Sequence, residues 1–322
     1  MAVRQPARTP KEKPTVAAQM RDALWAWFLL SRPPFHLVGL LPFTLGAVLA
    51  RQLGRTFRWD IFAWGLLGVV LIMLATYYAG EYWDYAEDLL SGAQGASRFA
   101  GGSQMLQRGL LPRKAPLWAS VLSVLLALAV GFLLQLGYGT GRWTVPLGLA
   151  GILGGFFYST HPLRWVSRGW GELWIAFCYG WLPVASSFYI QTQAIIPLIH
   201  WVAIPIGLTI FNVILLNEFP DYSADVEAGK RNLAVRLGRE RASALYSIVC
   251  VGSWLGMGLA VKRGVPPEAV WLYLPSLAVS VVLVAQVIRG RWRDRATLDK
   301  LCGLNIAVNL GTTAALILAF LV

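Results

Sequence analysis

Two acidic segments of this chain share one pattern of residue types. The segments 81–92 and 218–229 both read Glu, aromatic, any residue, Asp, Tyr, any two residues, Asp, and then Gly four residues later. Each residue of an α-helix advances about 100° around the axis, so positions 0, +3 and +7 fall on one face. The pattern therefore predicts three carboxylates on one helix face in each segment: Glu81, Asp84 and Asp88, then Glu218, Asp221 and Asp225.

Carboxylates gathered on one face repel each other unless a cation lies among them. Mg²⁺ prefers oxygen ligands and commonly links one or two carboxylates to substrate phosphates. We therefore expect the two faces to hold Mg²⁺ around a diphosphate. The alternative is that the acids only solvate helix ends at a membrane surface. Pro220 can break the second helix, so the one-face argument is firmer for the first segment.

The elements that must position these acids are membrane spans. The chain is 57% hydrophobic and 14% charged, which predicts an all-α, polytopic membrane protein. The acidic segments end the second and sixth spans, which suggests two related helical bundles, spans one to four and five to eight. Nine apolar stretches are expected to span the membrane: roughly 30–50, 60–80, 115–137, 143–159, 171–190, 196–217, 242–261, 268–288 and 300–321.

Lys and Arg are concentrated in the loops on one side of these spans. Residues 1–22 are expected to be a disordered, basic cytoplasmic tail, and residues 23–322 a single transmembrane domain. Both acidic segments then lie on the cytoplasmic side of the cell inner or plasma membrane, within cap loops at about 80–115 and 218–241. The basic charge also suits an anionic lipid surface, and no soluble basic domain suggests a nucleic-acid partner. The basic residues expected on the outer side are Arg51, Arg55, Arg58, Arg142, Lys262 and Arg263.

Basic residues near the acids could contact phosphate. Arg98 lies in a glycine-rich loop, where its planar guanidinium could bind phosphate oxygens; an ordinary flexible loop is the alternative. Lys230 directly follows the second segment and could also contact phosphate or serve only as a positive-inside residue. The three cysteines, Cys178, Cys250 and Cys302, have neither a metal-ligand spacing nor a plausible disulfide partner.

These motifs resemble the UbiA superfamily of membrane-bound aromatic prenyltransferases. The first acidic segment, with Gly80 before it, is similar to the family pattern Asn-Asp-x-x-Asp-x-x-x-Asp, and 221–232 is similar to Asp-x-x-x-Asp followed by Gly-Lys-x-Thr. The segment 158–172 and Arg32-Pro33 also resemble family segments. In this chain Gly80 replaces the usual Asn, Glu81 the usual Asp and Asn232 the usual Thr.

The resemblance implies nine helices around a central cavity and Mg²⁺-dependent transfer of a prenyl group from a prenyl diphosphate to an aromatic small molecule. It implies catalytic roles for Glu81, Asp84, Asp88, Asp221 and Asp225. Asn217 and Glu218 could join those five as metal ligands. Arg98, Tyr158, Arg164 and Lys230 are the expected diphosphate-binding residues. Aromatic residues near the motifs could shield an allylic cation: Tyr78, Tyr82, Trp83, Tyr85, Tyr158, Phe219 and Tyr222.

The run from Gly229 to Gly238 most resembles enzymes that prenylate 1,4-dihydroxy-2-naphthoate in menaquinone biosynthesis. Acceptors such as 4-hydroxybenzoate, homogentisate or a porphyrin-type molecule stay open, as does the prenyl chain length. An ion-coupled transporter is a rival, since repeats and intramembrane acids suit transport. A catalytically degenerate, lipid-binding member is another, because Gly80 removes one potential oxygen ligand.

Overall fold

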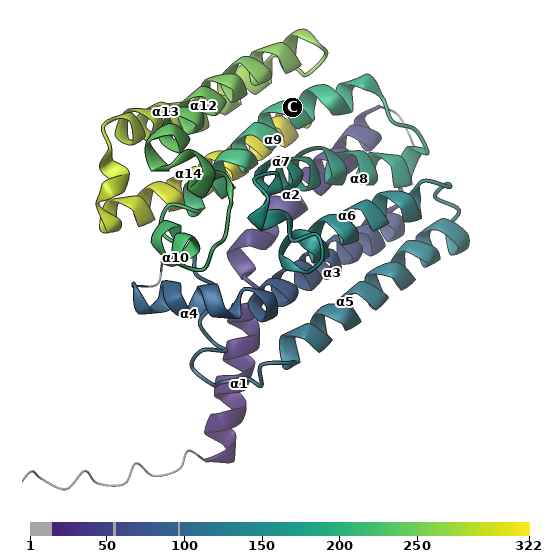
Figure 1. Ribbon diagram of the computed structural model, residues 1–322. Helices are drawn as coiled ribbons and strands as arrows, with labels where there is room; N and C mark the ends of the chain where they lie inside the picture. Colours follow the sequence, from purple (N-terminus) through teal and green to yellow (C-terminus); the bar gives the residue numbers. More distant parts are fainter. Residues whose placement is uncertain (1–14, 54–55, 96) are drawn as a thin grey trace, which may run out of the picture.

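The computed structural model describes residues 15–53, 56–95 and 97–322, and every regular element within that part of the chain is helical. Each apolar stretch expected to span the membrane contains a helix or a nearly continuous helical segment (Figure 1). These elements are α2 (Pro33–Gln52), α3 (Trp59–Trp83), α5 with η1 (Ala115–Phe132, Leu133–Gly137), α6 (Thr144–Ser159), α7 with η3 and α8 (Gly171–Ala176, Phe177–Trp181, Leu182–Thr192), α9 (Pro197–Asn217), α12 (Arg239–Lys262), α13 (Glu268–Ile288) and α14 (Arg295–Ala319).

Eight of these helical segments in the described part of the chain are long and apolar enough to cross a membrane. The ninth, α6, has 16 residues and falls short of a full span. The hydroxyl groups of Thr140 and Thr144 form a 2.7 Å hydrogen bond at its N-terminal end, and Thr160 is extended at its C-terminal end. The predicted count of nine spans is therefore not confirmed by helix length.

The spans pack in two groups joined by the fifth. The helix α3 packs on α5 and α6, while α9 packs on α12 and α14, and α13 packs on α14. The fifth span lies between the groups, because α8 packs on α2 and η3 packs on α9. That second contact is very close: a Cβ on Gly180 would lie 2.7 Å from the Cα of Gly207. Glycine at position 180 therefore lets two backbones meet where the groups join.

Both acidic segments interrupt their helices. The helix α3 ends at Trp83, and the chain turns at Asp84 into α4 (Tyr85–Ala93), which runs in a different direction (Figure 1). Likewise α9 ends at Asn217 and is followed by α10 (Tyr222–Glu227) and α11 (Leu233–Leu237). The prediction of one continuous helix face for each triplet is therefore wrong. The helices α4 and α10 pack together at one end of the molecule.

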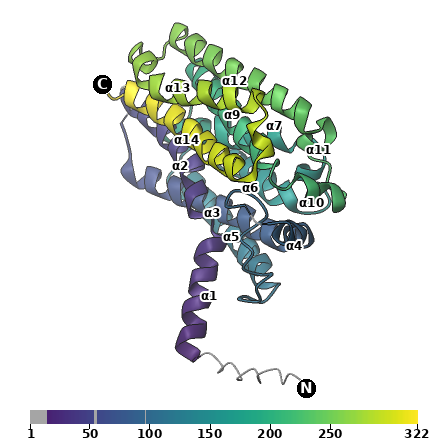
Figure 2. The same ribbon diagram turned by 90° about the vertical axis from the view of Figure 1, so that its left-hand side faces the viewer.

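The N-terminal region is partly helical. Residues 1–14 of the predicted tail lie outside the described residues, but 16–22 are the first turns of α1 (Val16–Leu30), so the boundary at 22 is not where the helix begins. Thr15 caps α1, its hydroxyl accepting a hydrogen bond from the amide of Ala18. In both ribbon views α1 extends away from the bundle at the end that carries α4 (Figure 2).

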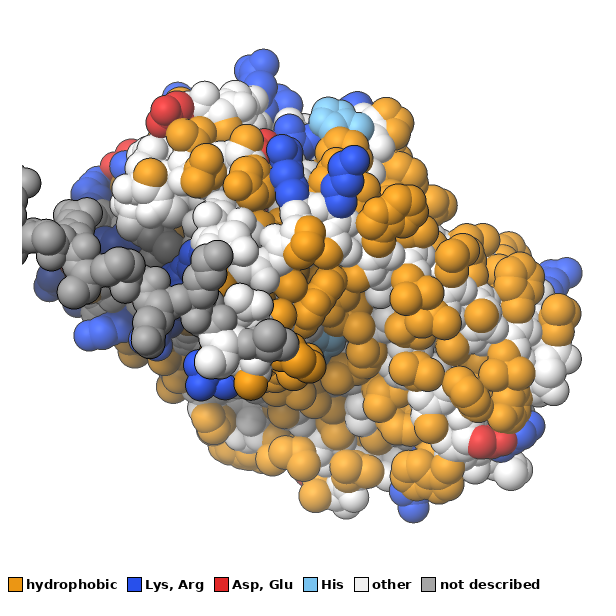
Figure 3. Space-filling view, turned by 90° about the horizontal axis from the view of Figure 1, so that it is seen from below, with side chains coloured by type: hydrophobic (Ala, Val, Ile, Leu, Met, Phe, Trp, Pro, Cys, Tyr) orange, Lys and Arg blue, Asp and Glu red, His pale blue; other side chains and the backbone are white. Residues whose placement is uncertain are grey.

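Large apolar side chains are exposed along the outside of the spans. They include Trp118, Leu122 and Leu125 on α5 and Ile248 and Leu255 on α12, all more than half exposed. Hydrophobic side chains cover a broad area of the face in Figure 3, with Lys and Arg gathered at its borders. Such a surface suits contact with lipid acyl chains. Two short 3₁₀ turns, η2 (Trp165–Ser167) and η4 (Arg291–Arg293), complete the helical elements.

Candidate functional site

A cavity lies where the two acidic segments meet, with a volume of about 190 Å³. We call it the acidic cavity. Its walls come from α2, α3, α4, α6, α9, α10 and the loop between α4 and α5, which we call the first cap loop (residues 94–114). Lys230 also lines this cavity. The acidic and amide side chains that line it are Asp84, Asp88, Asn217, Glu218, Asp221 and Asp225.

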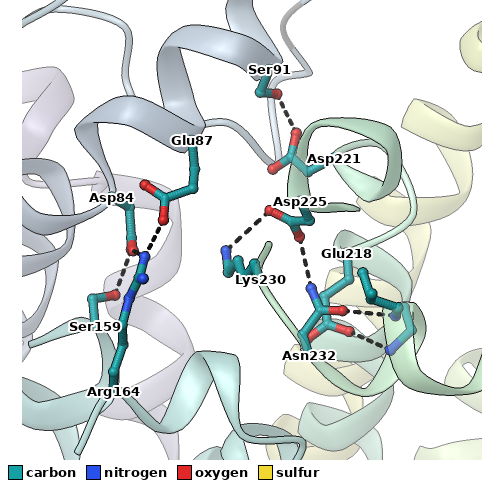
Figure 4. A network of polar contacts seen from close by, with 12 residues as sticks. Asp84, Glu87, Ser91, Ser159, Arg164, Glu218, Asp221, Asp225, Lys230 and Asn232 are labelled. Atoms are coloured by element: carbon teal, nitrogen blue, oxygen red, sulfur yellow. Dashed lines mark hydrogen bonds and ion pairs between the residues drawn. The ribbon is translucent and has the colours of Figure 1, made fainter. Parts of the chain in front are cut away.

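The first acidic segment is held by the last residue of α6 and by the loop after it (Figure 4). The hydroxyl of Ser159 donates to Oδ2 of Asp84 at 2.5 Å, and Nη2 of Arg164 donates to Oδ1 at 3.3 Å. The same guanidinium also pairs with Glu87. Arg164 thus bridges two carboxylates and fixes the start of α4 against the α6 end. It lies beside the acidic cavity rather than in its lining, and its predicted diphosphate contact would need it to exchange partners.

The second acidic segment is held by its own following loop. The amide nitrogen of Asn232 donates to Oδ2 of Asp225 at 2.7 Å, and its carbonyl oxygen accepts from the Val235 amide, capping α11. The Asn232 side chain therefore both orients Asp225 and caps the N-terminus of α11. Asp221 accepts a hydrogen bond from Ser91 on α4, which joins the two acidic segments directly (Figure 4).

Lys230 lies between the two acidic sets (Figure 4). Its Nζ is 3.4 Å from Oδ1 of Asp225. Burial acts to lower the pKa of Lys230, but the carboxylates around it, Asp225 first and then Asp84, reverse this and raise it above its ordinary value. Lys230 is therefore cationic at neutral pH. It is placed as a contact for an anionic group that enters between Asp84 and Asp225.

Glu81 does not line the acidic cavity, although it belongs to the first acidic motif. It is fully buried, and both of its oxygens have partners. Nη2 of Arg32 donates to Oε1 at 3.2 Å, the Ser103 amide donates to Oε1 at 2.8 Å, and the Ser103 hydroxyl donates to Oε2 at 2.8 Å. Glu81 thus ties the first cap loop and the start of α2 to α3. Sequence spacing alone could not separate this role from that of Asp84.

Two buried oxygens on the cavity wall accept no hydrogen bond from an N–H or hydroxyl group of the described residues: Oδ1 of Asn217 and Oε1 of Glu218. Burial, together with the neighbouring Glu172 carboxyl, raises the pKa of Glu218 well above its ordinary value. Carboxylate and amide oxygens of this kind suit a hard divalent cation. Within the described residues, no three Asp, Glu, His or Cys side chains are close enough to hold a metal ion by themselves. The oxygen donors of the cavity are thus spread over both acidic segments.

Two predicted contacts differ in their placement. Tyr158 lines the acidic cavity as expected, whereas Arg98 does not. Arg98 lies in a separate hollow on the other side of the first cap loop. Among the seven aromatic residues expected near a cation, only Tyr158 lines the cavity; Tyr82 and Tyr85, for example, lie under the Arg113 guanidinium.

Sequence reasoning missed most of the aromatic lining and two supporting acids. Aromatic residues on the cavity wall include Phe35, Tyr77 and Tyr179. Tyr77 could have been found, since it precedes Glu81 by one helical turn. Glu87 and Glu172 were also missed: Glu87 pairs with Arg164, while buried Glu172 accepts from the Leu233 amide at 2.8 Å.

An apolar chamber continues from the acidic cavity toward the middle of the spans. Thr76, Ile175 and Tyr179 line both spaces. The chamber has a volume of about 120 Å³ and lies among α2, α3, α5, α6 and α8. Its wall is rich in glycine and aliphatic side chains, and none of the described residues that line it is charged. An amphiphile could therefore place a charged head among the acids and an apolar tail in this chamber.

Comparison with known proteins gives consistent matches. A family model described as UbiA prenyltransferase family matches residues 23–309. The chain is 26% identical over 299 residues to 1,4-dihydroxy-2-naphthoate octaprenyltransferase of Bacillus subtilis, covering 91% of this chain and 89% of that one. It is 25% identical to 2-carboxy-1,4-naphthoquinone phytyltransferase of Synechocystis, covering 91% of each. A UbiA homolog from Archaeoglobus fulgidus solved with GPP and Mg²⁺ has the same fold, with a TM-score of 0.64, 17% identity and coverage of 91% and 99%.

Proposed function

Because this chain belongs to the UbiA prenyltransferase family and is an integral membrane enzyme, we propose that it transfers a polyprenyl group from a prenyl diphosphate to 1,4-dihydroxy-2-naphthoate. The observation that carries the proposal is the pairing of two acidic segments around Lys230, above an apolar chamber. The relatives from Bacillus subtilis and Synechocystis, whose names specify naphthalene-ring acceptors, support the choice of acceptor.

The acidic cavity has the donor groups for Mg²⁺. Asp84, Asp88, Asp221 and Asp225 would hold it, with the side-chain oxygens of Asn217 and Glu218 on the wall of the same cavity. When bound, Mg²⁺ would neutralise the negative charge that develops on the diphosphate as the bond between the prenyl carbon and the diphosphate oxygen breaks.

The chain's own residues perform the remaining tasks. Lys230 is cationic and contacts the diphosphate from the Asp225 side. Tyr158, Tyr179 and Tyr77 line the cavity, and Tyr179 also lines the apolar chamber. Their ring faces stabilise positive charge on the prenyl carbon and displace water that would otherwise trap it. We place this site on the cytoplasmic side, because basic residues are concentrated in the loops around it.

The test compares two adjacent basic residues. Lys230 is turned into the cavity against Asp225, whereas Arg231 is exposed. The full-length protein in nanodiscs is assayed with geranylgeranyl diphosphate and 1,4-dihydroxy-2-naphthoate, with Mg²⁺ or with EDTA. We expect Mg²⁺-dependent product, a loss of about 100-fold or more in kcat/KM for Lys230→Ala, and a change of about twofold or less for Arg231→Ala.

Two results would decide against the proposal. Equal effects of the two substitutions would mean that Lys230 acts only through general surface charge. Product from 4-hydroxybenzoate or homogentisate, with none from 1,4-dihydroxy-2-naphthoate, would keep the prenyltransferase activity and overturn the acceptor.

A further inference from the structure

The helix α1 carries an apolar face that no other part of the described chain covers. Met20, Leu24, Trp25 and Phe28 are each more than half exposed, and their spacing places them on one side of the helix. A shallow hollow on this side is lined only by residues of α1. The rings of Trp25 and Phe28 stack with their centres 5.3 Å apart, which joins them into one apolar surface.

Another side of α1 packs on the first cap loop. The buried members of this contact are Ala26 and Leu30 from the helix and Met105, Leu106 and Leu111 from the loop. The preceding part of the same loop, residues 99–102, lines the acidic cavity. The helix α1 therefore supports the loop that forms one wall of the site.

The turn between α1 and α2 fixes the direction of α1. Arg32 has a left-handed backbone with a φ of 49°, and its Nη2 is 3.2 Å from Oε1 of Glu81. The Nε2 atom of His36 lies 2.8 Å from the carbonyl oxygen of Ser31. In both ribbon views α1 runs at a steep angle to the spans (Figure 1, Figure 2). Because the first span begins at Pro33, α1 leaves the bundle at the level of the membrane surface.

The length and composition of α1 suit the surface of a bilayer better than its interior. Its 15 residues extend about 22 Å, short of the roughly 30 Å hydrocarbon core. A helix that lies along the surface buries an apolar face with Trp, Phe and Leu at the boundary between headgroups and acyl chains. The next exposed large apolar residue along the chain is Leu37 on the first span, so such side chains lie on both sides of the turn.

Basic residues flank this helix in the sequence and in the cap loop. Residues 1–14 contain four basic residues and one acid: Arg4, Arg8, Lys11, Lys13 and Glu12. In the loop, Arg113 and Lys114 are exposed close to the contact with α1. Arg21 adds little charge, because it is paired with Asp22 at 3.4 Å. Flanking basic residues attract anionic lipid headgroups, whereas a second copy of the chain would bring the same positive charge to the contact.

We propose that α1 is an interfacial helix, which docks on an anionic membrane surface through Met20, Leu24, Trp25 and Phe28 and so holds the first cap loop over the acidic cavity. Docking itself does not depend on the identity of the acceptor. Only its effect on turnover rests on the proposed function.

The position of α1 is measured with nitroxide spin labels on the full-length protein, in nanodiscs of phosphatidylcholine and phosphatidylglycerol. Leu24→Cys is labelled in a Cys178→Ala background, since the other two cysteines are buried. Oxygen, which dissolves in lipid, should reach this label, and a water-soluble nickel chelate should not. A label at Ile248→Cys, on the exposed outside of α12, should behave in the same way. A label at Asp22→Cys should be open to the chelate.

Three results would overturn the docking. Access of the chelate to position 24 equal to that at position 22 would place the apolar face in water. Dipolar coupling between position-24 labels would mean that a second copy covers the face. Equal protection of position 24 in nanodiscs of phosphatidylcholine alone would remove the requirement for an anionic surface.

Two substitutions at one position test the link to the cap loop. Leu24→Glu places a charge on the apolar face, whereas Leu24→Met keeps the face apolar. A label at Leu110→Cys reports the mobility of the loop, and a label at Phe28→Cys reports the position of the helix. We expect Leu24→Glu to raise the mobility of the loop label and to lower turnover by at least about threefold, because the loop then closes the cavity only part of the time. Leu24→Met should change neither.

The spin-label measurements need neither donor nor acceptor, so the inference and the proposed function can fail separately. Unaltered loop mobility and turnover in Leu24→Glu, with the Phe28 label moved into water, would overturn the link to the loop and leave the proposed function intact. Docking and loop ordering as expected, without prenyl transfer to any acceptor, would support the inference and count against the proposed reaction.

Discussion

Asp88 is buried on the wall of the acidic cavity, and no donor group in the described part of the chain is hydrogen-bonded to its carboxylate. Burial, together with the Glu81 and Asp84 carboxylates, raises the pKa of Asp88 well above its ordinary value. Burial also raises the pKa of Asp225, against the opposing effect of Lys230. Both side chains therefore keep their protons to a higher pH in the folded protein than in the unfolded chain.

This difference predicts how Mg²⁺ stabilises the protein. Without metal, the free energy of unfolding falls as pH rises through these raised pKa values, because the folded state must then bury a charge. Mg²⁺ binds the carboxylate forms and opposes that loss. We expect the increase in Tm caused by saturating Mg²⁺ to grow between about pH 5 and about pH 8, and Asp88→Asn to remove roughly half of that growth. Thermal unfolding in detergent, with and without Mg²⁺, measures it.

The matched control is Asp60→Asn, since Asp60 is exposed at the other end of α3. It should leave the pH dependence of the Mg²⁺ effect unchanged. A stabilisation by Mg²⁺ that is the same at every pH would mean that no carboxyl of raised pKa binds the metal. The same pH dependence in Asp88→Asn as in the unaltered protein would assign it to other groups.

The acidic motif did not distinguish the surroundings of its acids. Asp84 and Asp88 line the acidic cavity, while Glu81 is turned away from it and paired with Arg32. The spacing of acids along a helix cannot show this, because the outcome depends on a partner 49 residues away in sequence. In the sequence, Asn232 was recognised only as a departure from the family motif. The structure shows that its side chain donates a hydrogen bond to Asp225.

At the scale of elements, the first cap loop approaches the acids through a glycine. Gly102 has a φ of +64°, and a Cβ there would lie 2.6 Å from Cγ of Asp88, closer than real Cβ atoms come. Gly109 in the same loop has a similar φ of +71° but open space around it. The two glycines share a positive φ and differ in what surrounds them.

Alanine substitutions at Gly102 and Gly109 distinguish the effect of backbone strain from the effect of displacing Asp88. We expect Gly109→Ala to cost about 1 kcal/mol of stability from the left-handed backbone and to keep its activity. Gly102→Ala should carry the same strain and, in addition, lose about tenfold or more in kcat with a weaker response to Mg²⁺, because the methyl group pushes the Asp88 carboxylate away. Activity across a Mg²⁺ titration checks this. Equal losses in the two variants would show that only loop strain matters.

The sequence predicted the positions of the helices better than the breaks between them. Each expected apolar stretch is helical, because hydrophobic composition over a long run dictates a span. The break at Asp84 was not foreseen, since the spacing of acids was read on an uninterrupted helix. At the break, Asp84 accepts hydrogen bonds from Ser159, the last residue of α6, and from Arg164 in the following loop. The sequence around Asp84 does not predict contacts with residues 75 and 80 positions further along the chain.

At the scale of the whole molecule, the fold places three spaces in contact: the acidic cavity, the hollow lined by Arg98 and the apolar chamber. The acidic cavity shares Phe35 and Phe99 with that hollow, and Thr76 and Tyr179 with the chamber. This arrangement would bring a diphosphate head and its prenyl chain into two adjoining spaces. Composition predicts none of it, because the walls come from helices far apart in sequence.

The chamber gives a prediction about prenyl length. Gly148 on α6 lines it, and a Cβ there would meet no atom within 4 Å. A larger side chain at this position would therefore enter the chamber without displacing its neighbours. We expect Gly148→Phe to lower kcat/KM for a long donor such as octaprenyl diphosphate by about tenfold or more, while geranyl diphosphate is used nearly as before, since its shorter chain stops above the obstruction.

Gly258 on α12 supplies the control, because it too has open space around it but lies on the exposed outside of the bundle. Gly258→Phe should leave the ratio of long-donor to short-donor activity unchanged, which excludes a general effect of adding an aromatic ring to a glycine site in a span. Product lengths are compared by mass spectrometry with both donors present. If Gly148→Phe reduced both donors equally, the tail would not enter this chamber, and a path between other helices, such as α2 and α14, which also pack together, would have to hold it.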